Sequence, residues 1–145
     1  MKYVADTNVI SELMKPHPSD NVIDWFQDNE GMVYIAATTI DELYYGMLLL
    51  SDGRRKNQLR TAITGIVMDC SNKTLPFDGY SAYLCAELKT NARAQGRATS
   101  TEDAMIAAVA LRNDAIVATR NTKDFECLDV ACINPFEYDG RSHVR

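Results

Sequence analysis

The chain has 145 residues, of which 46% are hydrophobic, so it is long and apolar enough for one globular domain with a sizeable core. Acidic residues interrupt the apolar residues near the N-terminus, and no apolar run approaches the ~18 residues of a membrane span, so we expect a cytoplasmic protein without a membrane anchor. The net charge of -5 argues against a nucleic-acid binder with a positive surface, unless several carboxylates converge on a divalent cation.

Five short apolar runs predict the strands of a sheet. The first covers residues 2–6, where apolar and β-branched residues lead up to Asp6. The others lie at residues 32–37, 74–78, 115–118 and 130–133. Pro76 limits its run to a short strand or an extended edge. These lengths are typical of buried strands.

Helical periodicity predicts the segments between the strands. Apolar residues recur at i, i+3, i+4 and i+7 from Ile40 to Met47, which is typical of the buried stripe of a helix. Pro16 ends a short helix after the first strand, and Gly96 ends a longer one. Helices are expected at residues 9–15, 21–29, 40–47, 59–67, 80–95 and 104–111. Strands that alternate with helices imply right-handed parallel crossovers, so we predict an α/β fold with helices flanking a central parallel sheet.

No repeat or linker divides the chain. We therefore predict a single domain over residues 1–138 and a polar tail over residues 139–145. Basic residues cluster twice, at Arg54, Arg55, Lys56 and Arg60, and at Lys89, Arg93 and Arg97. Helical spacing places the second cluster along one face at i, i+4 and i+8. A solvated helix face is the simpler explanation of such clusters.

Three acids occupy similar local positions. Asp6 ends a predicted strand, where it either caps the next helix or faces the crevice in which open parallel sheets bind ligands. Thr39-x-x-Glu42 and Ser100-x-x-Asp103 each place an acid three residues after a hydroxyl, as in a capping box. Helices that begin near the carboxyl ends of strands would point these acids into the same crevice. The functional interpretation depends on this joint position.

Several converging carboxylates suit a hard divalent cation, Mg²⁺ or Mn²⁺. The four cysteines form no C-x-x-C pair, so a zinc site is not expected. The chemistry indicated is metal-assisted phosphodiester hydrolysis, in which a bound cation activates water and orients the phosphate. Asp124, or Asn121 beside it, would complete the set of ligands, and spacing alone leaves Asp41 and Glu102 as rivals of their neighbours.

Four segments follow one another at a spacing that identifies a family. They are Asp6-Thr-Asn-Val-Ile-Ser-Glu-Leu13, Thr39-Ile-Asp-Glu-Leu-Tyr-Tyr-Gly46, Ser100-Thr-Glu-Asp-Ala-Met-Ile-Ala-Ala108 and Ala118-Thr-Arg-Asn-Thr-Lys-Asp-Phe125. Together they resemble the PIN-domain ribonuclease toxins of the VapC type, and the closing Ile133-Asn-Pro-Phe136 is similar to the end of the FitB-like branch. The resemblance extends over residues 1–136, and its specificity comes from the ordered combination.

The resemblance implies a PIN-like α/β/α sandwich and Mg²⁺- or Mn²⁺-dependent cleavage of RNA, with tRNA among the possible targets. It also implies a toxin of a type II toxin-antitoxin system that inhibits translation until a VapB-type antitoxin neutralises it. Members of the family pair, so a homodimer or a toxin-antitoxin hetero-oligomer is expected.

Site residues are implied by the same match. Asp6, Glu42 and Asp103 correspond to the core acidic residues, with Asp6 and Asp103 as direct metal ligands. The match favours Glu42 over its neighbour at 41 and Asp103 over its neighbour at 102. Many relatives carry Asp where this chain has Asn121, so Asp124 is the candidate for the fourth acid. The supporting hydroxyls, which would orient metal-bound water, are those of Thr7 and Ser100.

Two other classes of protein share some of these features. A phosphoacceptor receiver domain also gathers acids at strand ends, but it predicts paired acids after the first strand, where this chain has Thr7 and Asn8. The second alternative is a catalytically weak PIN scaffold that binds RNA or a protein partner without cutting, which the Asn at position 121 leaves open.

Overall fold

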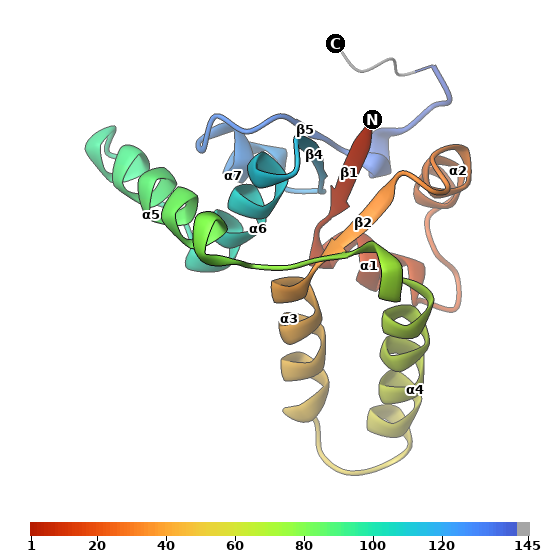
Figure 1. The fold of residues 1–145 in the computed structure, drawn as a ribbon. Helices are drawn as coiled ribbons and strands as arrows, with labels where there is room; N and C mark the ends of the chain where they lie inside the picture. Colours follow the sequence, from red (N-terminus) through yellow and green to blue (C-terminus); the bar gives the residue numbers. More distant parts are fainter. Residues whose placement is uncertain (142–145) are drawn as a thin grey trace.

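A computed structural model describes residues 1–141 and places five parallel strands in one sheet (Figure 1). In chain order the strands are β1 (Lys2–Ala5), β2 (Val33–Ala36), β3 (Thr74–Leu75), β4 (Ala115–Ala118) and β5 (Cys132–Ile133). The helices are α1 (Thr7–Leu13), α2 (Asp20–Asp28), α3 (Ala37–Leu48), α4 (Arg54–Asp69), α5 (Gly79–Ala94), α6 (Thr101–Arg112) and α7 (Thr122–Glu126), with 3₁₀ turns at Ser71–Lys73 (η1) and Pro135–Glu137 (η2). The predicted α/β/α sandwich is confirmed.

The sheet has the order β3-β2-β1-β4-β5, so the first strand lies at its centre. Tyr3 pairs with Val33 of β2 on one side and with Ile116 of β4 on the other. Because all the strands are parallel, their carboxyl ends share one edge of the sheet. The residues that directly follow β1, β2 and β4 therefore meet at this edge.

Successive strand residues point to opposite faces of the sheet, and each face has its own core. Tyr3 and Ala5 pack with the buried side chains of α1 to α4, whereas Val4 packs with those of α5 to α7. The small residues of α6, Ala104, Ala107, Ala108 and Ala110, are completely buried, which lets this helix pack closely against the sheet. Both faces are thus covered, as a parallel sheet requires.

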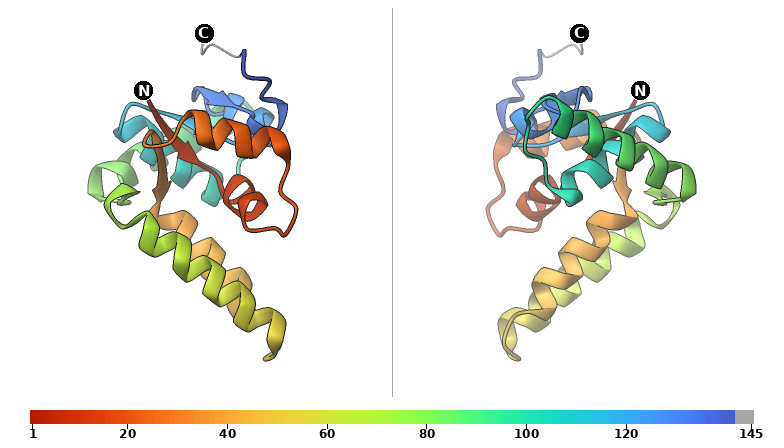
Figure 2. Two further views of the ribbon diagram at one scale, coloured as in Figure 1. Left: turned by 90° about the vertical axis from the view of Figure 1, so that its right-hand side faces the viewer. Right: turned by 90° about the vertical axis from the view of Figure 1, so that its left-hand side faces the viewer.

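Helices α3 and α4 form a hairpin that projects from the body of the domain (Figures 1 and 2). We call this hairpin, residues 37–69, the arm. The Tyr44 hydroxyl lies 3.1 Å from Oγ1 of Thr64, which joins the two helices. Leu43 and Met47 of the predicted stripe are buried, and so is Ile63 of α4. Since α3 begins at the residue after β2, the arm starts at the carboxyl edge of the sheet.

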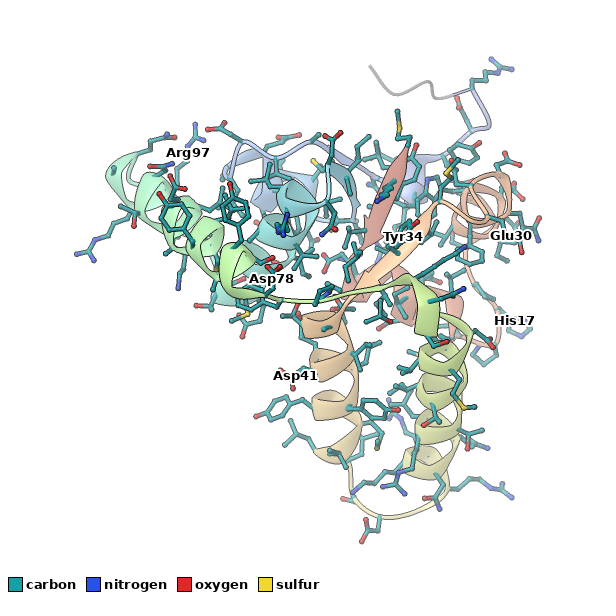
Figure 3. The ribbon with its side chains drawn as sticks, in the orientation of Figure 1. His17, Glu30, Tyr34, Asp41, Asp78 and Arg97 are labelled. Carbon is teal, nitrogen blue, oxygen red and sulfur yellow. The ribbon has the colours of Figure 1, made fainter. Side chains whose placement is uncertain are left out.

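The main difference from the sequence prediction is α7, a helix in a segment for which the sequence predicted neither a helix nor a strand. Strands β3 and β5 are only two residues long, shorter than the apolar runs that contain them. The predicted basic face of α5 is wrong in one respect, because Arg97 lies beyond the helix end. The chain turns at Gly96 (φ 68°), the Arg97 amide bonds Ala92 O, and the Arg97 guanidinium donates to Cys127 O at 3.3 Å (Figure 3).

Of the predicted tail, residues 139–141 are described, and residues 142–145 lie outside the described part of the chain. The C-terminal segment before the tail is held against α2. Asn21 Nδ2 donates to the Phe136 carbonyl at 2.7 Å, and the Tyr138 hydroxyl donates to Asp28 Oδ2 at 2.7 Å. Within residues 1–141, no helix combines the length and the apolar character that crossing a membrane requires.

Candidate active site

Asp6 is the first residue after the central strand and caps α1, as one of the two interpretations of this acid predicts. Its Oδ1 accepts a hydrogen bond from the Thr7 amide at 2.8 Å. Its Oδ2 accepts bonds from the Thr119 hydroxyl at 2.8 Å and from Asn8 Nδ2 at 3.2 Å. The side chain is only 5% exposed. These donors fix the carboxylate at the carboxyl edge of the sheet.

Glu42 enters the site from the arm. Its Oε2 accepts a hydrogen bond from the Thr7 hydroxyl at 3.0 Å, across 35 residues of sequence. Its Oε1 is buried and has no hydrogen-bond partner among the described residues. A buried carboxylate oxygen normally has a donor, so this atom is available for a ligand or a water molecule.

The predicted capping box at Thr39 is wrong. Helix α3 begins at Ala37 with Ala36 as its N-cap, so Thr39 already lies inside the helix. Its side chain is fully buried, and within the described residues its hydroxyl makes no hydrogen bond. The helix begins earlier because β2 passes into it without a turn. Glu42 is consequently held by Thr7 rather than by a local cap.

Asp103 is supplied by the first turn of α6. The Ser100 hydroxyl accepts a hydrogen bond from the Asp103 amide at 3.1 Å, so Ser100 is the N-cap of this helix as predicted. Helix α6 leads into β4 and runs back along the sheet, which places its N-terminus at the carboxyl edge. Ser100 thereby holds the backbone of Asp103, and its hydrogen bond to the half-buried carboxylate lowers the pKa of Asp103.

The three acids have perturbed electrostatics with a common cause. Burial raises the pKa of Asp6, Glu42 and Asp103 above their ordinary values. Hydrogen bonds from Thr119 and Thr7 lower the pKa of Asp6, and one from Thr7 lowers that of Glu42. The Asp6 charge further raises the pKa of both Glu42 and Asp103, so the carboxylates repel one another. A bound cation would relieve this repulsion.

Asp124 lies on α7 and lines an open depression. The depression has a volume of about 400 Å³ and is lined by Ala98, Thr99, Ser100, Asp103 and Asp124. The charge of Asp124 also raises the pKa of Asp6 and Asp103, which shows that it lies within electrostatic reach of both. Asn121 is exposed, and its backbone N–H donates a hydrogen bond to Thr119 Oγ1 at 3.0 Å. Asp124 therefore shares the depression with Asp103, whereas Asn121 contributes a backbone contact.

The two rival acids are placed differently from their neighbours. Asp41 is exposed on the outer side of α3 (Figure 3). Glu102 is also exposed, although its charge raises the pKa of Glu42 and of Asp103. The geometry thus brings Glu42 and Asp103 toward Asp6 and leaves Asp41 outside the cluster.

Thr119 is the residue that sequence reasoning missed. It is fully buried, and besides its bond to Asp6 its hydroxyl oxygen accepts from Asn8 Nδ2 at 3.3 Å. Asn8 also accepts a bond from the Arg120 amide at 3.1 Å, so it ties the start of α1 to the loop after β4. The available signal was position, since Thr119 directly follows a predicted strand. A single threonine adds nothing to hydrophobic periodicity, so the sequence pattern did not identify Thr119.

The donors present are suited to a hard cation. They are carboxylate oxygens, and the unpartnered Oε1 of Glu42 is among them. Within residues 1–141, however, no group of three or more Asp, Glu, His or Cys side chains is close enough to enclose a metal ion. Mg²⁺ is usually held by one or two carboxylates and completes its shell with water and substrate phosphate, so a full protein cage is not needed. The residues therefore fit a hydrated cation at the edge of the sheet.

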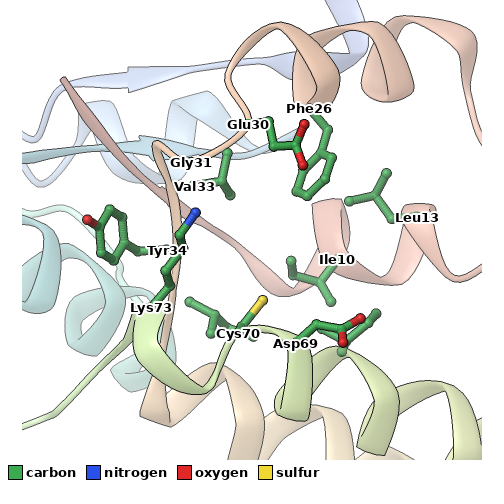
Figure 4. A pocket seen from close by; sticks show the side chains of 12 residues that line it. Ile10, Leu13, Phe26, Glu30, Gly31, Val33, Tyr34, Asp69, Cys70 and Lys73 are labelled. Atoms are coloured by element: carbon green, nitrogen blue, oxygen red, sulfur yellow. The ribbon is translucent and has the colours of Figure 1, made fainter.

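A larger apolar cavity lies elsewhere, between α1, α2, β2 and the end of α4 (Figure 4). Its volume is about 570 Å³, and Ile10, Leu13 and Phe26 form much of its wall. None of the four candidate acids lines it. Its apolar character suits a hydrophobic side chain better than a charged substrate, so it is not part of the acidic site.

Comparison with known proteins agrees with this fold. The PIN domain family matches residues 3–130. The chain is 36% identical to toxin FitB of Neisseria gonorrhoeae over 139 residues, which cover 92% of this chain and 97% of FitB. It is 35% identical to the VapC ribonuclease Y4jK of Sinorhizobium fredii over 136 residues, covering 92% of this chain and 97% of that protein. The structure of FitAB bound to an IR36 DNA fragment superposes with a TM-score of 0.84 at 34% identity, covering 97% of this chain and 99% of that one.

Proposed function

Because the chain belongs to the PIN-domain family, in the FitB-like branch of the VapC-type toxins, we propose that it is a metal-dependent endoribonuclease. The proposal is supported most by the position of Asp6, Glu42 and Asp103 at one edge of the sheet, where the charge of Asp6 raises the pKa of Glu42 and of Asp103 and the charge of Asp103 raises that of Glu42. These acids come from three distant segments, and no basic side chain contributes to their pKa shifts. Their mutual repulsion destabilises the fold unless a ligand binds them.

Mg²⁺ or Mn²⁺ would be held by Asp6 and Asp103, and when bound it would lower the pKa of water and neutralise charge on the phosphate. Thr119 and Asn8 keep Asp6 Oδ2 in a fixed orientation. Thr7 orients Glu42, which leaves Oε1 free to accept a hydrogen bond from the attacking water. Asp124, which lines the depression, adds negative charge and is the candidate for the fourth acid.

The biological role that we propose is that of a type II toxin. Cleavage of RNA, with tRNA as the first substrate to examine, would stop translation in the cytoplasm. FitB is itself named a toxin, and the FitAB structure describes it in an assembly. We therefore expect a VapB-type antitoxin to neutralise this chain, in a homodimer or a toxin-antitoxin hetero-oligomer.

Cleavage assays with purified, antitoxin-free protein test the proposal. Total tRNA and ribosomal RNA are incubated with Mg²⁺ or Mn²⁺, and in parallel with EDTA. We expect discrete fragments that disappear with EDTA and with the Asp103→Asn variant. If folded protein cuts neither RNA under any metal condition, the binding scaffold becomes the better description.

The fourth acid is tested in the same assay. Asp124→Asn should slow cleavage, because Asp124 lines the depression beside Asp103. Asn121→Ala is the matched control, since only the backbone of Asn121 contacts the network. The reverse order of effects would assign the fourth position to Asn121.

A further inference from the structure

The outer part of the arm carries charge of the opposite sign to the rest of the chain. Between Leu48 and Thr61, at the far end of the arm, there are four basic residues and one acid, Asp52, whereas the whole chain has a net charge of -5. Lys56 is half-buried and bonded to Asp52 at 3.1 Å, so these two charges are paired. Three exposed arginines, Arg54, Arg55 and Arg60, make no ion pair with any described residue.

Folding alone does not account for these arginines. Arg54 and Arg55 are the first residues of α4, where the helix dipole disfavours cations, and no acid lies in that turn. The preceding Gly53 supplies no side-chain cap. Residues that destabilise their own helix and make no compensating contact are typical of a functional surface.

The arginines lie on the hairpin that also supplies Glu42. Helix α3 leaves the carboxyl edge of the sheet, and its 12 residues extend the arm by ~18 Å. The start of α4 is at the far end of the arm (Figures 1 and 2). Glu42, in the second turn of α3, and the arginines, in α4, are therefore on the two helices of the same arm. A folded RNA that enters the acidic site and extends along the arm can reach both.

We propose that Arg54, Arg55 and Arg60, which we call the basic end, form a second RNA-binding surface that holds the phosphate backbone of a folded RNA. The inference rests on the proposed nuclease function and adds to it a separate surface that holds the RNA beyond the cleavage site. The argument is charge complementarity: the acidic site repels a polyanion, and exposed guanidinium groups bind phosphate through paired hydrogen bonds. The acids position the scissile bond, and the basic end supplies affinity.

Binding as a function of salt tests this inference. In an Asp103→Asn background, which prevents cleavage, the affinity for a folded tRNA is measured by fluorescence anisotropy over a series of salt concentrations. The double variant Arg54→Gln/Arg55→Gln should bind about 3- to 10-fold more weakly and should lower the slope of log K against log salt by about 1 to 2, since each phosphate contact releases counterions. A short single-stranded oligonucleotide, which fills only the acidic site, should bind equally well to both proteins.

Lys89→Gln/Arg93→Gln is the matched control, because Lys89 and Arg93 are two exposed cations of α5 that are also unpaired within residues 1–141. An equal loss with this control, or an unchanged salt slope in the double variant, overturns the inference. The inference is also overturned if the double variant keeps its affinity for RNA but binds a negatively charged antitoxin more weakly. Misfolding is separable, because removing cations from the start of α4 should leave Tm equal or higher.

Cleavage of folded tRNA separates this inference from the proposed function. If protein without substitutions does not cut tRNA with Mn²⁺, the nuclease function fails, whatever the arm variants do. If it cuts, and the double variant binds folded RNA like its parent, only the role of the basic end fails.

Discussion

The Thr119 hydroxyl donates a hydrogen bond of 2.8 Å to Oδ2 of Asp6, although 113 residues separate them in sequence. Thr119 follows β4 and Asp6 follows β1, and these strands are neighbours in the sheet. Strand pairing therefore creates the contact, and Ala5 lies opposite Ala118 in the register. The orientation of the central carboxylate depends on this pairing.

Thr119→Val is expected to slow cleavage by about 10- to 100-fold, because residues that orient a metal ligand typically matter by that factor. Thr119→Ser should restore most of the rate, since it keeps the donor. The measurement is the cleavage rate over a range of Mn²⁺ concentrations, and the Val variant should need more Mn²⁺ for half of its maximal rate. An unchanged metal dependence in Thr119→Val would assign the hydroxyl a purely structural role.

Divalent cations are expected to stabilise the fold in a pH-dependent way. The pKa values of Asp6, Glu42 and Asp103 are raised by folding, so the stability that these groups contribute in metal-free protein is present at low pH and is lost as the pH rises through the folded pKa values. Mn²⁺ should therefore raise Tm by a few degrees near pH 7 and by less near pH 4.

The Asp103→Asn variant is the control for this measurement. It removes one of the repelling charges, so in metal-free protein near neutral pH its Tm should equal or exceed that of the parent. Its response to Mn²⁺ should be smaller. A large loss of stability in the metal-free variant would contradict the repulsion inferred from the pKa directions.

Glu12 is expected to stabilise the junction between α1 and α2. Its carboxylate accepts hydrogen bonds from Lys15 Nζ at 2.9 Å and from the Ser19 amide at 3.2 Å. The bond from Lys15 is the main reason that the pKa of Glu12 is lowered, so its contribution is present at neutral pH and is lost as the pH falls through that lowered pKa. Glu12→Gln should lower Tm near neutral pH, and the difference should shrink in acid.

Glu30→Gln, at an exposed acid, is a suitable control for thermal denaturation of the Glu12 variant over a range of pH. We expect no comparable change for it. A Glu12→Gln deficit that persists at low pH would point to lost packing rather than lost charge.

Thr39→Val is expected to leave stability unchanged or to increase it by about 1 kcal/mol, since it removes a buried hydroxyl that has no partner within residues 1–141. Cleavage should be unaffected, because Glu42 is oriented by Thr7. Chemical denaturation and the tRNA assay measure the two effects. If Thr39→Val is less stable than the parent, the Thr39 hydroxyl does make a stabilising hydrogen bond.

Local patterns in the sequence determined the alternation of strands and helices, the central acids and the Ser100 cap, because period-2 and period-3.6 hydrophobicity and caps act over a few residues. The α7 helix was not predictable in this way, since its five residues contain too little periodicity. The same holds for the start of α3, where β2 continues directly into the helix and removes the expected cap.

Only the tertiary structure decided which distant side chains meet. The strand order places β1 between β2 and β4, and this order brings Thr7 to Glu42 and Thr119 to Asp6. It also decided that the Arg54 cluster lies at the end of a projecting arm instead of on the body of the domain. Periodicity contains no information on which strands pair, because pairing depends on the packing of whole elements, and so the geometry of the site is a property of the folded chain.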